Sequence, residues 1–150
     1  MDVMIKPKAI ICDLDGTLCE IRHRLHFING KKKDWKSFQR NCFGDGLNEW
    51  CKDILVAMKA QKCEIILFSG RMDFVRNETE DWLERNGIEY LTLKMRKSGD
   101  YREDYIVKKE MLNDYKNRFN ILFAIDDRQQ VVDMWRENGI VCLQCQKGDY

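Results

Sequence analysis

A large net charge and long hydrophobic stretches are two things that this sequence lacks. Its 26 Lys and Arg residues nearly balance 25 Asp and Glu, which leaves +1 over 150 residues. No strong overall field draws the molecule to nucleic acid or membrane, so any basic surface must be local. Residues 1–8 hold no apolar run long enough for a signal peptide or a transmembrane helix, so we expect no membrane contact and a cytoplasmic protein. Repeats, low-complexity tracts and linkers are also missing, and this length suits one well-buried domain.

The cysteines and histidines argue against a disulfide framework and against a zinc site. Seven cysteines, an odd number, are scattered through apolar segments, which disfavours a disulfide framework and indicates a reducing cytosol. Cys142 and Cys145 have the C-x-x-C spacing, but no second pair or nearby histidine completes a zinc site, so we expect them in a C-terminal strand. His23 and His26 also lack a third ligand nearby and are interpreted as surface residues.

Apolar, β-branched runs alternate with stretches of helical periodicity along most of the chain. We expect strands over 8–12, 64–68, 88–93, 120–125 and 140–143, and helices over 48–62, 74–86, 103–118 and 129–138. Such alternation implies right-handed crossovers between parallel strands. The sequence therefore predicts an α/β fold, a parallel sheet with helices on both faces.

The segment 19–47 departs from this alternation. It is polar, basic and aromatic, and it is too long for a tight strand-to-helix turn. We interpret it as a small flap inserted over the carboxyl end of the first strand. Cations interleaved with aromatic residues suit a nucleotide, whose base stacks while its phosphate pairs. Trp35 and Phe38 are either base-stacking platforms or the flap's own small core, and the core is the favoured interpretation.

The most informative motif is Asp13-Leu14-Asp15-Gly16-Thr17, directly after the apolar run 9–12. This pattern predicts a buried strand whose carboxyl end presents two carboxylates. Because ionised carboxylates this close repel, either one is protonated or a cation lies between them. An aspartate near a hard divalent metal can attack phosphorus, and a neighbouring acid can give a proton to the leaving oxygen.

Three further polar clusters follow other predicted strands at their carboxyl ends. They are Ser69 with Arg71, then Arg96, then Asp126 with Asp127. Open parallel sheets bind ligands at this edge, so all four clusters should meet in one crevice. Carboxylates from the first and fourth strands can hold Mg²⁺, while a serine, an arginine and a lysine from the following helix can hold phosphoryl oxygens.

Together these clusters resemble the four motifs of the haloacid dehalogenase (HAD) superfamily of phosphatases, over nearly the whole chain. Within it, four segments are similar to the 3′-phosphatase domain of bacteriophage polynucleotide kinase: 6–10, 96–108, 124–136 and 148–150. The resemblance implies a Rossmann-like HAD fold with a small cap after the first strand. No phosphate-binding kinase loop G-x-x-x-x-G-K-S/T is present, so we expect a free-standing phosphatase without the 5′-kinase half.

The resemblance also implies roles for single residues. Asp13 would attack phosphorus to form an aspartyl-phosphate, and Asp15 would protonate the leaving hydroxyl and then activate water. Ser69 and Lys108 would hold the phosphoryl oxygens. Asp126 and Asp127 would complete a Mg²⁺ site with Asp13 and the backbone carbonyl of Asp15. Which of Asp126 and Asp127 binds the ion directly is left open. Four more residues match positions that contact substrate or support the site: Arg24, Arg71, Arg96 and Asp104.

Two substrates stay open at this stage. The favoured one is the 3′-phosphate of a polynucleotide end, and the alternative is a nucleoside monophosphate, as for a 5′(3′)-nucleotidase. A non-catalytic binding protein is disfavoured because both acids of the first motif, Ser69 and Lys108 are intact. The phage resemblance implies nucleic-acid repair in a bacterial host cytoplasm.

Overall fold

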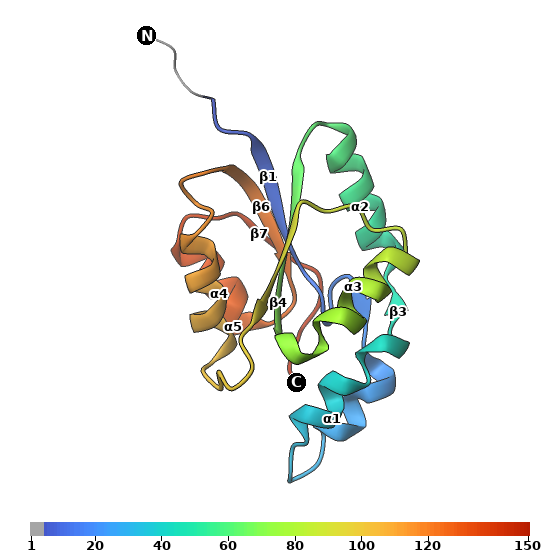
Figure 1. Cartoon of the computed structure of the whole chain (residues 1–150). Coiled ribbons are helices and arrows are strands. Elements are labelled where there is room, and N and C mark those ends of the chain that lie inside the picture. The colour runs from blue at the N-terminus through green and yellow to red at the C-terminus, as the bar shows by residue number, and fades with distance from the viewer. Residues whose placement is uncertain (1–4) are drawn as a thin grey trace.

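The computed structural model describes residues 5–150, and at its centre five parallel strands pair in the order β5-β4-β1-β6-β7. The strands are β1 (Lys8–Asp13), β4 (Glu64–Met72), β5 (Thr92–Arg96), β6 (Asn120–Asp126) and β7 (Cys142–Gln144). Four helices connect them: α2 (Glu49–Ala60), α3 (Arg76–Arg85), α4 (Asp104–Asn113) and α5 (Gln129–Glu137). Figure 1 shows α2 and α3 on one side of the sheet and α4 and α5 on the other. The predicted α/β fold with a parallel sheet is confirmed.

Two hydrophobic cores hold the helices to the sheet. Successive side chains of a strand point to opposite faces, so the central strand β1 contributes to both cores. Ile10 and Cys12 pack in the core that includes α2 and α3 residues, whereas Ala9 and Ile11 pack in the core with α4 and α5. Trp82 and Trp135 are 1% and 0% exposed, one in each core. The central position of β1 fixes the residue at its carboxyl end, Asp13, in the middle of the sheet edge.

The expected strand over 88–93 is wrong at its start, because Ile88 completes a helix ending and residues 89–91 lie outside any strand. The Gly87 amide donates to the Glu84 carbonyl, and the Ile88 amide donates to the Leu83 carbonyl, both at 3.0 Å. This is a Schellman ending, in which Gly87 takes the left-handed conformation (φ 66°) and Ile88 packs back on the helix. Strand β5 therefore begins at Thr92 and includes Arg96, which was expected in the loop beyond it.

Two other predicted boundaries shift. Strand β4 runs past residue 68 to Met72, so Ser69 and Arg71 belong to the strand rather than to a loop, and its register with β5 shifts after Ser69. Helix α4 ends at Asn113 rather than near 118. The seven cysteines are free. Cys142 lies in β7 as expected, whereas the same expectation is wrong for Cys145, which follows the last residue of that strand. None of the helices within residues 5–150 combines the length and apolarity needed to cross a bilayer.

The segment between β1 and α2 forms small elements of its own. They are β2 (Cys19–Glu20), the 3₁₀ turns η1 (Arg22–Phe27) and η2 (Cys42–Gly44), helix α1 (Trp35–Arg40) and β3 (Gly46–Leu47), with β2 and β3 antiparallel. Phe38 is 2% exposed, as a core residue should be, but the same expectation is wrong for Trp35, which is 37% exposed. Trp35 begins α1 at the surface, beneath the Lys33 ammonium. Figure 1 shows α1 below the sheet, on the side where the C-terminus lies.

Candidate active site

A lysine and two aspartates from three elements meet at the carboxyl edge of the sheet. Asp13 and Asp126 are the last residues of β1 and β6, which pair directly. Lys108 reaches in from α4, with its Nζ 2.7 Å from Asp13 Oδ1 and 3.0 Å from Asp126 Oδ2. Burial opposes the charge of Lys108, but the carboxylates of Asp126 and Asp13 raise its pKa well above the ordinary value. The ammonium is therefore retained and faces both acids.

Asp127 adds a third carboxylate to the group. Oxygens of Asp13, Asp126 and Asp127 lie within 4.8 Å of one another. Burial and the charge of Asp126 raise the pKa of Asp127 to about 7, and the same causes raise that of Asp13 against the pull of Lys108. Asp127 Oδ2 is buried without a hydrogen-bond partner. Three acids against one ammonium leave negative charge uncompensated, which suits a hard divalent cation with oxygen ligands.

Thr17 supports the carboxylate of Asp13, a role that sequence reasoning missed although the residue stands within the first motif. Its hydroxyl donates to Asp13 Oδ2 at 3.0 Å. The Asn48 amide in turn donates to the Thr17 carbonyl at 2.7 Å. With Lys108 on Oδ1 and Thr17 on Oδ2, both oxygens of Asp13 are held in place.

Asp15 is clamped by two buried arginines. Arg24 Nη2 and Arg71 Nη2 each lie 2.6 Å from Asp15 Oδ1. Burial alone would raise the pKa of Asp15, but the two guanidiniums hold it well below its usual range. Both arginines were expected to contact substrate or support the site. In the structure they support Asp15.

Asp45 completes this network, and no motif in the sequence indicated it. Its carboxylate accepts hydrogen bonds from Arg24 Nε and Nη2 at 2.7 Å and from Arg71 Nη2 at 2.9 Å. The His23 ring nitrogen Nε2 lies 2.7 Å from the same carboxylate. Asp45 therefore ties the inserted segment to Asp15 through a balanced set of two carboxylates and two guanidiniums.

Arg96 and Asp104 lie together beside the site, where Arg96 organises backbone. Arg96 Nη2 donates to Asp104 Oδ1 at 3.1 Å, and its Nε donates to the Gly70 carbonyl at 2.8 Å. Arg96 is only 9% exposed, so it is not a solvated loop cation. Asp104 approaches Gly70 so closely that a side chain there would overlap its carboxylate.

Ser69 lies on β4 near Asp13, because β4 pairs with β1 and Phe68 is aligned with Asp13. The Ser69 hydroxyl accepts a hydrogen bond from the Arg71 amide at 3.1 Å. It is buried, and no contact to Lys108 is made within residues 5–150. The structure thus places Ser69 at the same sheet edge as Asp13 without joining it to the lysine.

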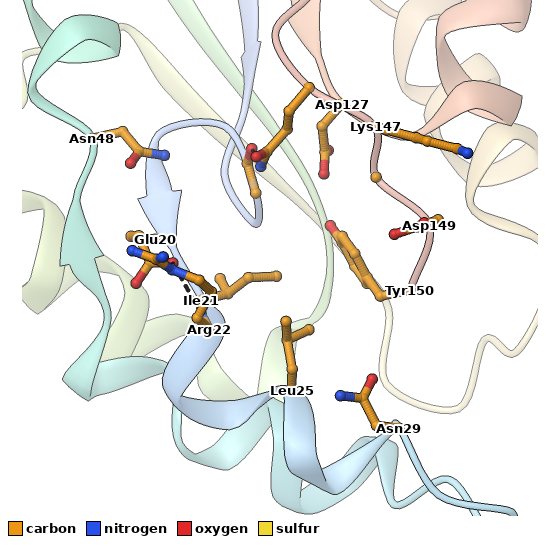
Figure 2. Close-up of a pocket in the computed structure, with 13 residues that line it drawn as sticks. Glu20, Ile21, Arg22, Leu25, Asn29, Asn48, Asp127, Lys147, Asp149 and Tyr150 are labelled. Carbon is orange, nitrogen blue, oxygen red and sulfur yellow. Dashed lines mark hydrogen bonds and ion pairs between the residues drawn. The ribbon is translucent and has the colours of Figure 1, made fainter.

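The C-terminal segment 146–150 lies against the first motif. The Tyr150 hydroxyl donates to the Asp15 carbonyl at 2.8 Å, and the Gly148 amide donates to the Asp127 carbonyl at 3.1 Å. The Gln146 side chain donates to the Gly16 carbonyl. Figure 2 shows a cavity between this segment and η1. It opens beside the carboxylate group.

The chain is similar in sequence to known proteins of nucleic-acid repair. Residues 7–150 match the family model of the polynucleotide kinase PNKP phosphatase domain. A protein of Autographa californica nuclear polyhedrosis virus, named for polynucleotide kinase and RNA ligase activities, is 30% identical over 137 residues, which are 87% of this chain and 18% of that protein.

Solved structures agree with this similarity. A chain in the structure of the Pnkp1/Rnl/Hen1 RNA repair complex is 38% identical with a TM-score of 0.84, over 100% of this chain and 46% of that one. The class C acid phosphatase from Bacillus anthracis, solved with tungstate bound, shares the fold at 18% identity and a TM-score of 0.70, over 97% and 68% of the two chains. The chain thus spans less than half the length of the viral relative and of the RNA-repair protein.

Proposed function

This chain belongs to the family of polynucleotide kinase PNKP phosphatase domains and is a HAD-family phosphatase, and from that premise we propose that it removes the 3′-phosphate from polynucleotide ends. The observation that carries the proposal is the meeting of Asp13, Lys108 and Asp126 at adjoining strand ends, in a chain that matches the family over residues 7–150. The viral relative and the RNA-repair relative support nucleic acid as the substrate class. The resemblance of the motifs to the bacteriophage domain extends the proposal to a phage protein that acts in a host cytoplasm.

Asp13 is the nucleophile in this proposal. One of its carboxylate oxygens attacks phosphorus, the bond from phosphorus to the 3′-oxygen breaks, and an aspartyl-phosphate forms. Lys108, 2.7 Å from Asp13, offsets the repulsion between the carboxylate and the incoming phosphate. Ser69, which lies on the neighbouring strand β4, donates a hydrogen bond to a phosphoryl oxygen. Thr17 keeps the attacking group in one orientation.

Asp15 gives a proton to the leaving 3′-oxygen and then takes one from the water that hydrolyses the aspartyl-phosphate. To act as the acid it must first hold a proton, yet Arg24 and Arg71 lower its pKa. The proposal therefore includes a weakening of these two contacts before Asp15 takes up its proton. A bound phosphate draws guanidinium groups to itself and so weakens their hold on Asp15.

Asp13, Asp126, Asp127 and the Asp15 carbonyl are the oxygen donors proposed for Mg²⁺. The unpartnered, buried Asp127 Oδ2 supports this assignment. Both oxygens of Asp126, by contrast, already accept hydrogen bonds from Lys108, Trp135 and the Asp127 amide, so Asp127 has the freer oxygen for the ion. When bound, Mg²⁺ supplies positive charge that stabilises the negative charge of the phosphoryl group.

A panel of four substrates tests the function. Release of inorganic phosphate is measured from a 3′-phosphorylated oligonucleotide, its 5′-phosphorylated counterpart, and nucleoside 3′- and 5′-monophosphates, with Mg²⁺ or with EDTA. We expect Mg²⁺-dependent release that is most efficient for the 3′-phosphorylated oligonucleotide, lost in Asp13→Asn and kept in Asp53→Asn, an exposed aspartate on α2. Faster hydrolysis of free nucleotides would make the protein a nucleotidase instead, and no release from any substrate refutes the proposal.

A further inference from the structure

A cavity of about 480 Å³ opens between η1 and the C-terminal segment 146–150. One wall carries the aliphatic side chains of Ile21 and Leu25, and the facing wall carries Tyr150 (Figure 2). Asn29 stands at the rim, exposed and with no side-chain hydrogen bond within residues 5–150. The walls thus combine aliphatic surface and an aromatic ring with amides and charged groups, the latter from Glu20, Arg22, Lys147 and Asp149.

The floor of this cavity reaches the carboxylate group of the active site. Gly16 and Asp127 line it, and Asp127 is fully buried with its Oδ2 unpartnered. A side chain at Gly16 or at Gly148 would overlap that oxygen, so the two glycines let the backbone pack closely against Asp127. Tyr150 also joins cavity and site, because its hydroxyl donates to the Asp15 carbonyl at 2.8 Å. Anything held in the cavity lies next to the residue that protonates the leaving oxygen.

The cavity is larger than a metal ion and its waters require. One water takes about 30 Å³ in the liquid, so a cavity near 480 Å³ has room for far more than the few waters of a bound ion. The volume instead falls among small-molecule sites, which span about 300–1,000 Å³ and combine apolar walls with a few polar groups. A nucleoside has this composition: a flat aromatic base, polar edges and a sugar.

We propose that this cavity seats the base and sugar of the terminal nucleotide, with the base against Tyr150 and Leu25, while its 3′-phosphate lies at Asp13. The inference rests on the proposed function, because the seated nucleoside is the leaving group whose 3′-oxygen Asp15 protonates. Stacking on an aromatic side chain tolerates every base, since each has a π-face. The seat therefore recognises the presence of a base and not its identity.

The test compares two oligonucleotides that differ only in the last base. One ends in thymidine 3′-phosphate, and the other ends in an abasic tetrahydrofuran 3′-phosphate. We expect the wild-type kcat/KM to favour the thymidine end by about 5- to 150-fold, the equivalent of 1–3 kcal/mol for one stacked base. Taking the ratio within each variant cancels changes at the catalytic groups.

Variants of the two walls test the position of the seat. Leu25→Ala should bring the ratio toward one by lowering kcat/KM for the thymidine end alone. His26→Ala, a control on the same turn that does not line the cavity, should keep it. Tyr150→Phe keeps the ring and should keep the ratio, whereas Tyr150→Leu should lose it even if both variants change the absolute rate through Asp15.

Several outcomes distinguish a failure of this inference from a failure of the proposed function on which it rests. Equal hydrolysis of both ends by the wild type overturns the seat and leaves the phosphatase intact. An unchanged ratio in Leu25→Ala and Tyr150→Leu also overturns it. If neither end is hydrolysed, the proposed function fails and the seat fails with it.

Discussion

Replacing Asp45 with asparagine should destabilise the protein more than any change at an exposed carboxylate of the same segment. The Asp45 side chain is 0% exposed and is held by Arg24, Arg71 and His23. Asparagine keeps the shape but removes the charge, and it turns one acceptor oxygen into an amide donor that faces guanidinium donors. Two buried guanidiniums then share the single carboxylate of Asp15.

The expected loss in free energy of unfolding follows from this imbalance of buried charges. Breaking a buried ion pair by removing one partner costs about 3–5 kcal/mol. Asp15 still accepts from both arginines, so we expect the lower end, about 3 kcal/mol. For a domain of this size each kcal/mol lowers the melting temperature by about 2–4 °C, which predicts a drop of about 6–12 °C.

Urea denaturation followed by tryptophan fluorescence measures the free energy of unfolding directly. The matched control is Asp34→Asn, an exposed aspartate that caps α1 in the same segment, and its loss should be clearly smaller. A loss in Asp45→Asn below about 1 kcal/mol, the size usual for surface pairs, would show that the two arginines do not depend on Asp45.

Three further predictions concern the charges of the fold. Lys108→Met should lower the free energy of unfolding by about 3–5 kcal/mol, because two buried carboxylates lose their ammonium; an unchanged denaturation midpoint would contradict this. Mg²⁺ should raise the melting temperature of the wild type by binding only the folded state, and Asp127→Asn should reduce that rise, a result that needs no substrate. Asp100 has a pKa lowered from 3.8 to about 2 by hydrogen bonds from Arg102, so it stabilises the fold above about pH 4, and this contribution disappears as the pH falls toward 2. Asp100→Asn should flatten the pH dependence of unfolding in that window, and an unaltered profile would refute this.

The sequence predicted the parts of the site that follow regular structure. Apolar runs mark parallel strands, and a carboxylate that follows such a run must stand at one edge of the sheet. Asp13 and Asp126 met there as expected, because β1 and β6 pair. The lysine was placed by family resemblance, and the structure brings its Nζ to 2.7 Å from Asp13 Oδ1.

What the sequence did not predict depends on contacts between distant residues. Asp45 carries no local signal, since its meaning comes from arginines 21 and 26 residues away along the chain. The start of β5 was misplaced because Ile88 looks like a strand residue but completes a helix ending. Trp35 is similar: hydrophobicity alone favoured burial, while its position at the start of α1 leaves it at the surface.

The most direct test of the central claim is to locate the phosphoryl group on the protein during turnover. An Asp15→Asn variant, which lacks the acid for the leaving oxygen and the base that activates water, is incubated with Mg²⁺ and p-nitrophenyl phosphate, whose leaving group departs without a proton. The reaction is quenched in acid and digested for mass spectrometry. We predict one phosphoryl group on the peptide that contains Asp13, and none after Asp13→Asn is added to the variant. Phosphorylation of a different residue, or release of phosphate by the wild type with no phosphorylated protein in either enzyme, would contradict the claim.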